Sequence, residues 1–252
     1  MYIEKASVES NLKIAENIFL IKVNSPAIAH SAKPGQFCNI KVSENDFPLL
    51  RRPFSVCDVD GDYIFFLFDV HGEGTKILSN KKKGDLIDLL GPLGNGFVLE
   101  GAFDIALIIA GGLGTAPFPL LIKKLPEEKR VTCFVGGKTK NNVINYGLKN
   151  IFCSTDDGSY GFHGTVIDLL KSEIAKFDKT KFRIFACGPN PMLKALQNYS
   201  IENNYECQIS VERNMACGFG ICQGCPIDSA NGDSYLLVCK DGPVFNANEV
   251  KL

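Results

Sequence analysis

The sequence predicts an α+β protein of several domains: an antiparallel β-barrel over residues 1–98, an α/β domain with a parallel sheet over residues 99–208, and a small cysteine-rich domain over residues 209–252. Three observations support this division. Short β-branched and aromatic runs fill the first part, apolar runs alternate with helix-like segments in the second, and closely spaced cysteines mark the third. A chain of 252 residues is long enough for two or three domains.

In the first part, strands are expected at residues 17–23, 37–42 and 63–70, where β-branched and aromatic side chains gather. Glycine, proline and asparagine residues separate these runs, as turns require. Many short strands with such turns predict a small antiparallel barrel. The one helix-like segment expected here covers residues 74–80.

The pattern changes after residues 91–97. Residues 105–110 form a continuous apolar run, which is typical of a strand buried on both faces of a parallel sheet. The alternation of strands and helices that follows predicts a βαβ nucleotide-binding domain. Further strands are expected at residues 130–135, 151–154 and 182–187, and helices at 118–125, 166–175 and 191–203.

Composition excludes several classes of function. A hydrophobic fraction of 45% and a charged fraction of 22% are those of an ordinary globular protein. A formal net charge of −1 provides no basic surface for nucleic acid. No apolar run approaches the ~20 residues that a membrane-spanning helix needs, and Met1–Lys5 does not begin a secretory signal. We therefore expect a cytoplasmic protein.

Four cysteines near the C-terminus have a C-x₄-C-x₂-C spacing followed by a later fourth cysteine, which is the thiolate pattern of a [2Fe–2S] cluster. These are Cys217, Cys222, Cys225 and Cys239. The interleaved glycines allow the loop to wrap tightly, with backbone N–H groups aimed at the sulfurs. A structural zinc site, a set of disulfides and unligated thiols are the alternatives, but zinc more often takes two C-x₂₋₄-C pairs. With no export signal, the other six cysteines are expected to be reduced thiols: Cys38, Cys57, Cys133, Cys153, Cys187 and Cys207.

Two glycine-containing motifs end predicted strands of the α/β domain. Gly112 and Gly114 would let the backbone approach a pyrophosphate at the start of a helix, with Thr115 beside them. Cys187 and Gly188 end the last apolar strand, where ligands bind in open α/β sheets. A plain structural turn and a small buried thiol explain the same residues.

Two motifs of the barrel suit a flavin. Arg52 could fork onto pyrophosphate oxygens, Phe54 could stack, and Ser55 could hydrogen-bond the ring edge. Gly74 and Thr75 come before a short helix, which also suits phosphate. Singly, a solvated strand edge and an ordinary turn are equally natural readings. The order of the motifs along the chain favours cofactor binding over these structural explanations, because a barrel with flavin motifs is followed by a nucleotide-binding domain and then by the cluster cysteines.

On these residues the chain resembles the ferredoxin–NADP reductase superfamily. Arg52-x-Phe54-Ser55 is similar to its R-x-Y-S flavin motif, with phenylalanine in place of tyrosine. More narrowly, the chain resembles the electron-transfer subunits of type B dihydroorotate dehydrogenases. The residues that carry this narrower match are 51–55, 91–97, 111–117, 155–159 and 215–225.

The resemblance implies three cofactor sites. FAD contacts map onto Arg52, Pro53, Phe54, Ser55, Leu67, Phe68, Asp69, Gly74 and Thr75, and NAD contacts onto Gly112, Gly114, Thr115, Cys187 and Gly188. The cluster ligands map onto the four C-terminal cysteines. Relatives tend to have a Tyr-Arg pair where this chain has Phe68–Asp69, so the Asp69 backbone rather than its carboxylate is left to line the site.

The implied activity is an electron relay in pyrimidine (UMP) biosynthesis. Electrons from dihydroorotate reach FMN in a separate catalytic subunit, cross the [2Fe–2S] cluster, reduce FAD and leave as a hydride to NAD⁺. Hydride transfer demands positioning above all, so we expect no catalytic acid or base on this chain. The partner is expected to be that FMN subunit, in a complex of two copies of each chain.

Three other readings are considered. Subunits of an NADH-dependent ferredoxin:NADP oxidoreductase or of a sulfhydrogenase would carry aspartate at one cluster position, whereas all four positions here are cysteine. An oxygenase reductase would have a longer gap before the fourth cysteine. A zinc-stapled module without redox activity would be colourless, and an absorption spectrum separates it from a flavin–iron–sulfur protein.

Overall fold

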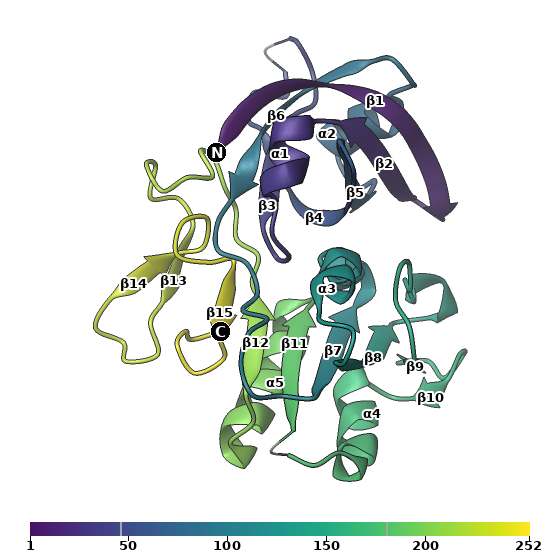
Figure 1. Cartoon of the computed structure of the whole chain (residues 1–252), viewed down its shortest axis with the longest axis vertical. Coiled ribbons are helices and arrows are strands. Elements are labelled where there is room, and N and C mark those ends of the chain that lie inside the picture. The colour runs from purple at the N-terminus through teal and green to yellow at the C-terminus, as the bar shows by residue number, and fades with distance from the viewer. Residues whose placement is uncertain (46, 180) are drawn as a thin grey trace.

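The computed structural model describes residues 1–45, 47–179 and 181–252. A closed antiparallel barrel lies above an α/β domain, and the C-terminal segment lies beside both (Figure 1). The predicted fold class is therefore confirmed. Because all three parts approach one another at the centre of the molecule, a site between them can draw side chains from each.

The barrel closes in the strand order β1-β2-β5-β4-β3-β6. Side chains that point inward, such as Ile21, Ile40 and Phe66, are fully buried. The strands and helices expected in this region correspond to β2, β3, β5 and α2. The elements are β1 (Tyr2–Ala15), β2 (Ile18–Asn24), α1 (Pro26–Ser31), β3 (Phe37–Lys41), β4 (Arg52–Asp60), β5 (Tyr63–Asp69), α2 (Glu73–Ser79) and β6 (Leu86–Leu93).

Helix α1 has no counterpart among the predicted elements. Its first N–H groups, those of Ala27 and Ile28, donate to the carboxylate of Glu4 on β1, and the Ser25 hydroxyl donates to the same group. The cap of this helix thus comes from a distant strand rather than from its own sequence.

The α/β domain is built on a seven-stranded sheet of order β10-β9-β8-β7-β11-β12-β15. The first six strands pair in parallel, and β15 pairs antiparallel with β12. Every residue of β7 is buried, as its continuous apolar run predicts. The strands are β7 (Ile105–Gly111), β8 (Arg130–Gly137), β9 (Ile151–Thr155), β10 (Phe162–His163), β11 (Phe182–Cys187), β12 (Cys207–Ser210) and β15 (Val244–Asn246).

The expected helices of this domain are present as α3 (Phe118–Lys124), α4 (Val166–Glu173) and α5 (Asn190–Asn203). Short 3₁₀ helices cover Gly112–Thr115, Lys140–Asn142 and Ile174–Lys176. Among the described residues, no helix is both long and apolar enough to cross a membrane.

The C-terminal segment leaves β12, forms the hairpin of β13 (Pro226–Asp228) and β14 (Tyr235–Leu237), and returns to the sheet as β15 (Figure 1). Asn95 fastens this segment to the end of the barrel: its N–H donates to the Gly242 carbonyl at 2.5 Å, and its side chain donates to the carbonyls of Lys240 and Asp241. The cysteine-bearing loop is thus held between the barrel and the α/β sheet.

Candidate functional site

A cavity of about 200 Å³ lies where the three parts of the chain meet. The barrel contributes one wall, the strand ends of the α/β sheet contribute a second, and the segment leading to the cysteines contributes a third. Its lining residues are Phe37, Pro53, Phe54, Ser55, Leu67, Phe68, Asp69, His71, Leu113, Ala116, Pro117, Cys187, Ser210, Val211, Glu212, Arg213, Met215 and Pro243.

The barrel wall comes from two neighbouring strands. β4 supplies Pro53, Phe54 and Ser55, and β5 supplies the run from Leu67 to Asp69. The rings of Phe54 and Phe68 meet edge to face with centroids 5.7 Å apart, which fixes the aromatic surface of this wall. Six residues predicted from the flavin motif therefore line a single cavity.

Asp69 does not point a free carboxylate into this cavity. Its Oδ1 lies 3.0 Å from Nδ1 of His71, which lines the same cavity. The His71 ring thus occupies the carboxylate that distinguishes this chain from the expected Tyr-Arg pattern.

Arg52 and Gly74 lie against each other at the entrance to α2. A Cβ on Gly74 would stand 2.7 Å from Nε of Arg52, so glycine is needed for the guanidinium to lie across the start of this helix. The Thr75 hydroxyl closes the turn instead: it accepts N–H bonds from His71 and Gly72 at 3.1 and 3.2 Å. Arg52 Nη1 donates to the Leu50 carbonyl, so the other guanidinium N–H groups of Arg52, rather than Thr75, are the available donors here.

The two nucleotide motifs of the α/β domain meet directly. A Cβ on Gly114 would stand 2.2 Å from the Cys187 carbonyl oxygen and 2.7 Å from Cα of Gly188. Only glycine permits this approach between the turn after β7 and the end of β11. Thr115 is fully buried, and its hydroxyl donates to the Ile144 carbonyl at 2.6 Å, so it holds the turn from behind. Gly112, with φ +54°, has no neighbour within 4 Å of an added Cβ and faces open space.

Cys187 and Glu212 shape the electrostatics of the cavity. Cys187 is buried; its burial, and secondarily the charge of Glu212, raise the pKa of this thiol to about 12, so it stays protonated. Glu212 reaches solvent at the cavity mouth, yet surrounding protein removes much of its water. That desolvation, followed by the charge of Asp69, raises the pKa of its carboxyl, while His71 opposes the shift.

The four predicted cluster cysteines form two pairs. The Cys222 N–H points at Sγ of Cys217 at 3.4 Å, and the Cys239 N–H points at Sγ of Cys225, also at 3.4 Å. Among the described residues, no group of three or more His, Cys, Asp or Glu side chains is close enough together to hold a single metal ion. Two pairs of thiols suit a two-iron cluster, which takes ligands at two centres, better than one tetrahedral zinc.

The chemistry of these thiols fits a cationic centre. Burial alone would raise the pKa of Cys217, but the N–H groups of Cys222, Phe219 and Ile221 and the Cys222 side chain lower it to about 6. Cys239 behaves in the opposite way: burial and then the neighbouring Cys225 thiol raise its pKa to about 12. Two thiolates this close repel each other, and a metal cluster removes that repulsion.

Sequence reasoning missed several residues of the cavity. Glu212, Arg213 and Met215 come between β12 and Cys217, and His71 opens the motif of which only Gly74 and Thr75 are predicted as site residues. The position of Glu212, just beyond the end of a parallel strand, is the signal that could have found it.

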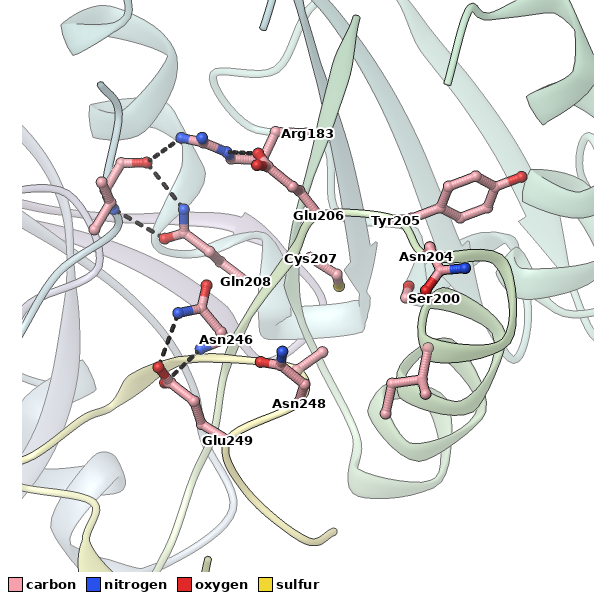
Figure 2. A pocket seen from close by; sticks show the side chains of 13 residues that line it. Arg183, Ser200, Asn204, Tyr205, Glu206, Cys207, Gln208, Asn246, Asn248 and Glu249 are labelled. Carbon is pink, nitrogen blue, oxygen red and sulfur yellow. Dashed lines mark hydrogen bonds and ion pairs between the residues drawn. The ribbon is translucent and has the colours of Figure 1, made fainter. Parts of the chain in front are cut away.

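A larger cavity, of about 680 Å³, opens at the opposite end of the sheet, where β11 and β12 begin (Figure 2). Some of its polar side chains are paired with one another or with the backbone. Arg183 donates to Glu206 at 2.8 Å, Gln208 exchanges two hydrogen bonds with the backbone of Val98, and Asn246 donates to Glu249 at 3.0 Å (Figure 2). These bonds engage part of the polar lining, whereas Ser200 Oγ is buried without a hydrogen-bond partner among the described residues.

Comparison with known proteins places the site in context. Residues 212–251 match the family model described as the iron–sulfur cluster binding domain of dihydroorotate dehydrogenase B. The chain is 41% identical to the electron transfer subunit of dihydroorotate dehydrogenase B (NAD(+)) from Caldanaerobacter subterraneus subsp. tengcongensis, over 98% of this chain and 97% of the relative. It is 39% identical to the corresponding subunit from Bacillus velezensis, over 98% of each chain.

Solved structures agree on the fold. A structure of an NADH-dependent reduced ferredoxin-NADP oxidoreductase aligns with a TM-score of 0.84 and 29% identity, over 98% of this chain and 90% of that one. A ferredoxin NADP⁺ reductase from Neisseria gonorrhoeae with bound FAD and NADP aligns with a TM-score of 0.66 and 17% identity, over 86% of this chain and 96% of that one. At that identity the second likeness shows the fold alone.

Proposed function

The chain belongs to the family of electron transfer subunits of dihydroorotate dehydrogenase B, and from that membership we propose that it links a dihydroorotate dehydrogenase catalytic subunit to NAD⁺ in pyrimidine biosynthesis. The observation that carries the proposal is the central cavity, which is walled by the barrel, by the α/β strand ends and by the segment that leads to the paired cysteines. When bound, an iron–sulfur cluster exchanges single electrons, a nicotinamide exchanges two together, and a flavin does either.

The barrel side of the cavity is the proposed FAD site. Arg52, lying over Gly74, offers guanidinium donors to pyrophosphate oxygens. Phe54, which the fully buried Phe68 contacts edge to face, would give an aromatic wall for the ring. The remaining proposed contacts are Pro53, Ser55, Leu67, Asp69 and Thr75.

The opposite side is the proposed NAD site. Gly112 leaves open space for a ligand, and Gly114 brings the turn after β7 against Cys187 and Gly188. Thr115 supports this turn from within the domain. A thiol that stays protonated at Cys187 provides a neutral, polarizable surface at the point where a nicotinamide would meet the flavin. No acid or base on this chain is required for hydride transfer.

Cys217 with Cys222, and Cys225 with Cys239, are the proposed ligands of a [2Fe–2S] cluster. The second pair is buried, whereas Cys222 is exposed beside Ile221, whose exposed fraction is 75%. An apolar residue this exposed next to a redox ligand suits contact with another protein. We infer that this face meets the FMN-containing catalytic subunit, in a complex of two copies of each chain.

We also propose the domain limits 1–98, 99–208 and 209–252, with the matched residues 212–251 supporting the last. A cytoplasmic setting is proposed because all ten cysteines are free, including the six outside the predicted cluster.

Anaerobic titration tests the function. The purified chain should show flavin and iron–sulfur absorption, and dihydroorotate should bleach the flavin only when the catalytic subunit is present. Bleaching of the chain by dihydroorotate alone, or absence of both flavin and iron from oxygen-protected samples, would contradict the proposal.

A further inference from the structure

One buried side chain of the barrel reaches directly into the cysteine loop. Asn39 on β3 is fully buried, and its Nδ2 donates to the backbone carbonyl of Cys217 at 3.0 Å. Its Oδ1 has no hydrogen-bond partner among the described residues. A buried amide that satisfies only one of its ends is placed for a particular contact, since buried polar groups are otherwise paired.

The loop is shaped to receive this amide. A Cβ on Gly218 would stand 2.1 Å from Nδ2 of Asn39, so only glycine, here with φ +82°, lets the loop approach β3 so closely. The contact between the loop and β3 therefore depends both on glycine at position 218 and on asparagine at position 39.

The strand beneath the contact is fixed on both sides. Asn39 pairs with Pro53 of β4 on one edge and with Leu90 of β6 on the other. The neighbouring Arg51 donates to the Asp88 carbonyl and carboxylate, both at 2.9 Å, which ties the start of β4 to β6. The amide thus stands on a rigid part of the barrel, directly beside the strand that carries the proposed flavin contacts.

We propose that Asn39 is a positioning residue that sets the distance between the iron–sulfur cluster and the flavin by fastening the Cys217 end of the cluster loop to β3. This inference rests on the proposed function. Electron transfer between two bound centres falls steeply with their separation, so a loop that moved away from β3 would slow that transfer without altering the NAD site. Asn95 fastens the segment after Cys239 independently, so loss of one anchor need not release the loop.

Asn39→Leu tests the proposal, because leucine keeps the branched shape of asparagine and removes the donor. Asn11→Leu is the matched control: Asn11 is likewise a barrel amide with an unpartnered Oδ1, but its Nδ2 donates to the carbonyls of Leu78, Ser79 and Lys81, away from the cysteines. Gly218→Ala attacks the same contact from the loop side.

Two measurements apply. In the loaded chain, stopped-flow mixing with NADH separates flavin reduction by hydride from the later passage of single electrons from flavin to cluster. Asn39→Leu should leave the first rate unchanged and slow the second by about tenfold or more, whereas Asn11→Leu should change neither. In the chain without cofactors, hydrogen exchange of residues 215–221 should become faster in Asn39→Leu and in Gly218→Ala, but not in Asn11→Leu.

An unchanged flavin-to-cluster rate in Asn39→Leu with full iron content would overturn the proposal. Unchanged loop exchange would do so as well, even if the variant lost its cluster. Failure of the proposed function looks different, because the unsubstituted chain would then bind neither flavin nor iron.

Discussion

The contact between Gly114 and the end of β11 predicts a specific defect on adding one methyl group. In Gly114→Ala, the new Cβ would lie 2.2 Å from the carbonyl oxygen of Cys187, 2.5 Å from its carbon and 2.7 Å from Cα of Gly188. All three atoms belong to backbone, so no side-chain rotation relieves the clash. Overpacking of this kind costs about 1–3 kcal/mol.

The strained residues, Gly114, Cys187 and Gly188, belong to the proposed NAD site. If the strain is relieved by moving Cys187 and Gly188 away from the turn after β7, a loss of about 1–3 kcal/mol in the NADH complex corresponds to about 5–150-fold weaker binding or slower hydride transfer. FAD and iron content should stay those of the unsubstituted chain, because neither proposed site includes this contact.

The assay is stopped-flow reduction of the bound flavin by NADH, with urea unfolding as the stability readout. Gly72→Ala is the control, since nothing lies within 4 Å of its added Cβ, and it should leave both readouts close to those of the parent. The reasoning is refuted if Gly114→Ala reduces its flavin at the parent rate and unfolds at the parent urea concentration.

Three further outcomes are expected. Arg52→Ala should weaken FAD binding by about tenfold or more, as loss of charge-assisted hydrogen bonds does, measured by flavin release on dilution; full flavin retention would contradict the assigned contact. Ile221→Lys should abolish co-elution with the catalytic subunit, whereas Leu12→Lys, on a 56% exposed barrel residue, should not; unchanged co-elution would exclude this face. Thr165→Ala should lower the free energy of unfolding by about 1 kcal/mol, because its hydroxyl accepts the Asp168 N–H at the start of α4. The Thr165 hydroxyl also lowers the pKa of Asp168, so this stability is present above the ordinary aspartate pKa and is lost as pH falls through the lowered value; urea unfolding at pH 7 and pH 3 checks it, and an equal effect at both would contradict it.

The strands and helices with strong local signals could be predicted from the sequence. β7 is buried along its whole length, and its continuous apolar run predicts this burial without knowledge of any other segment. β12 is also buried along its whole length, yet its residues include Gln208 and Ser210, whose burial depends on partners elsewhere in the chain. Gln208 bonds to the backbone of Val98, a contact that local sequence does not reveal. The same limit explains α1, which Glu4 caps from another strand.

The candidate site divides in the same way. Phe54 could be found because its sequence neighbours Pro53 and Ser55 also line the cavity, and Cys187 could be found because it ends a strand that the sequence predicts. Glu212 belongs to no motif and reaches the cavity only where the domains meet. The two-pair arrangement of the cysteines is likewise a product of folding, since Cys239 comes from beyond a hairpin to meet Cys225.

The connection between β12 and the cysteines constrains where electrons can enter. Ser210 ends the last parallel strand and lines the cavity, and Cys217 is the first proposed cluster ligand. Seven residue steps span at most about 25 Å when fully extended, and the residues between them that also line the cavity are Val211, Glu212, Arg213 and Met215. The cluster loop therefore cannot lie far from the strand ends, and the Asn39 contact brings it against β3, next to the flavin wall. This connectivity is compatible with the proposed arrangement of a nicotinamide at the strand ends, a flavin in the cavity and a cluster at the loop, with the Cys222 face proposed as the surface that meets the partner.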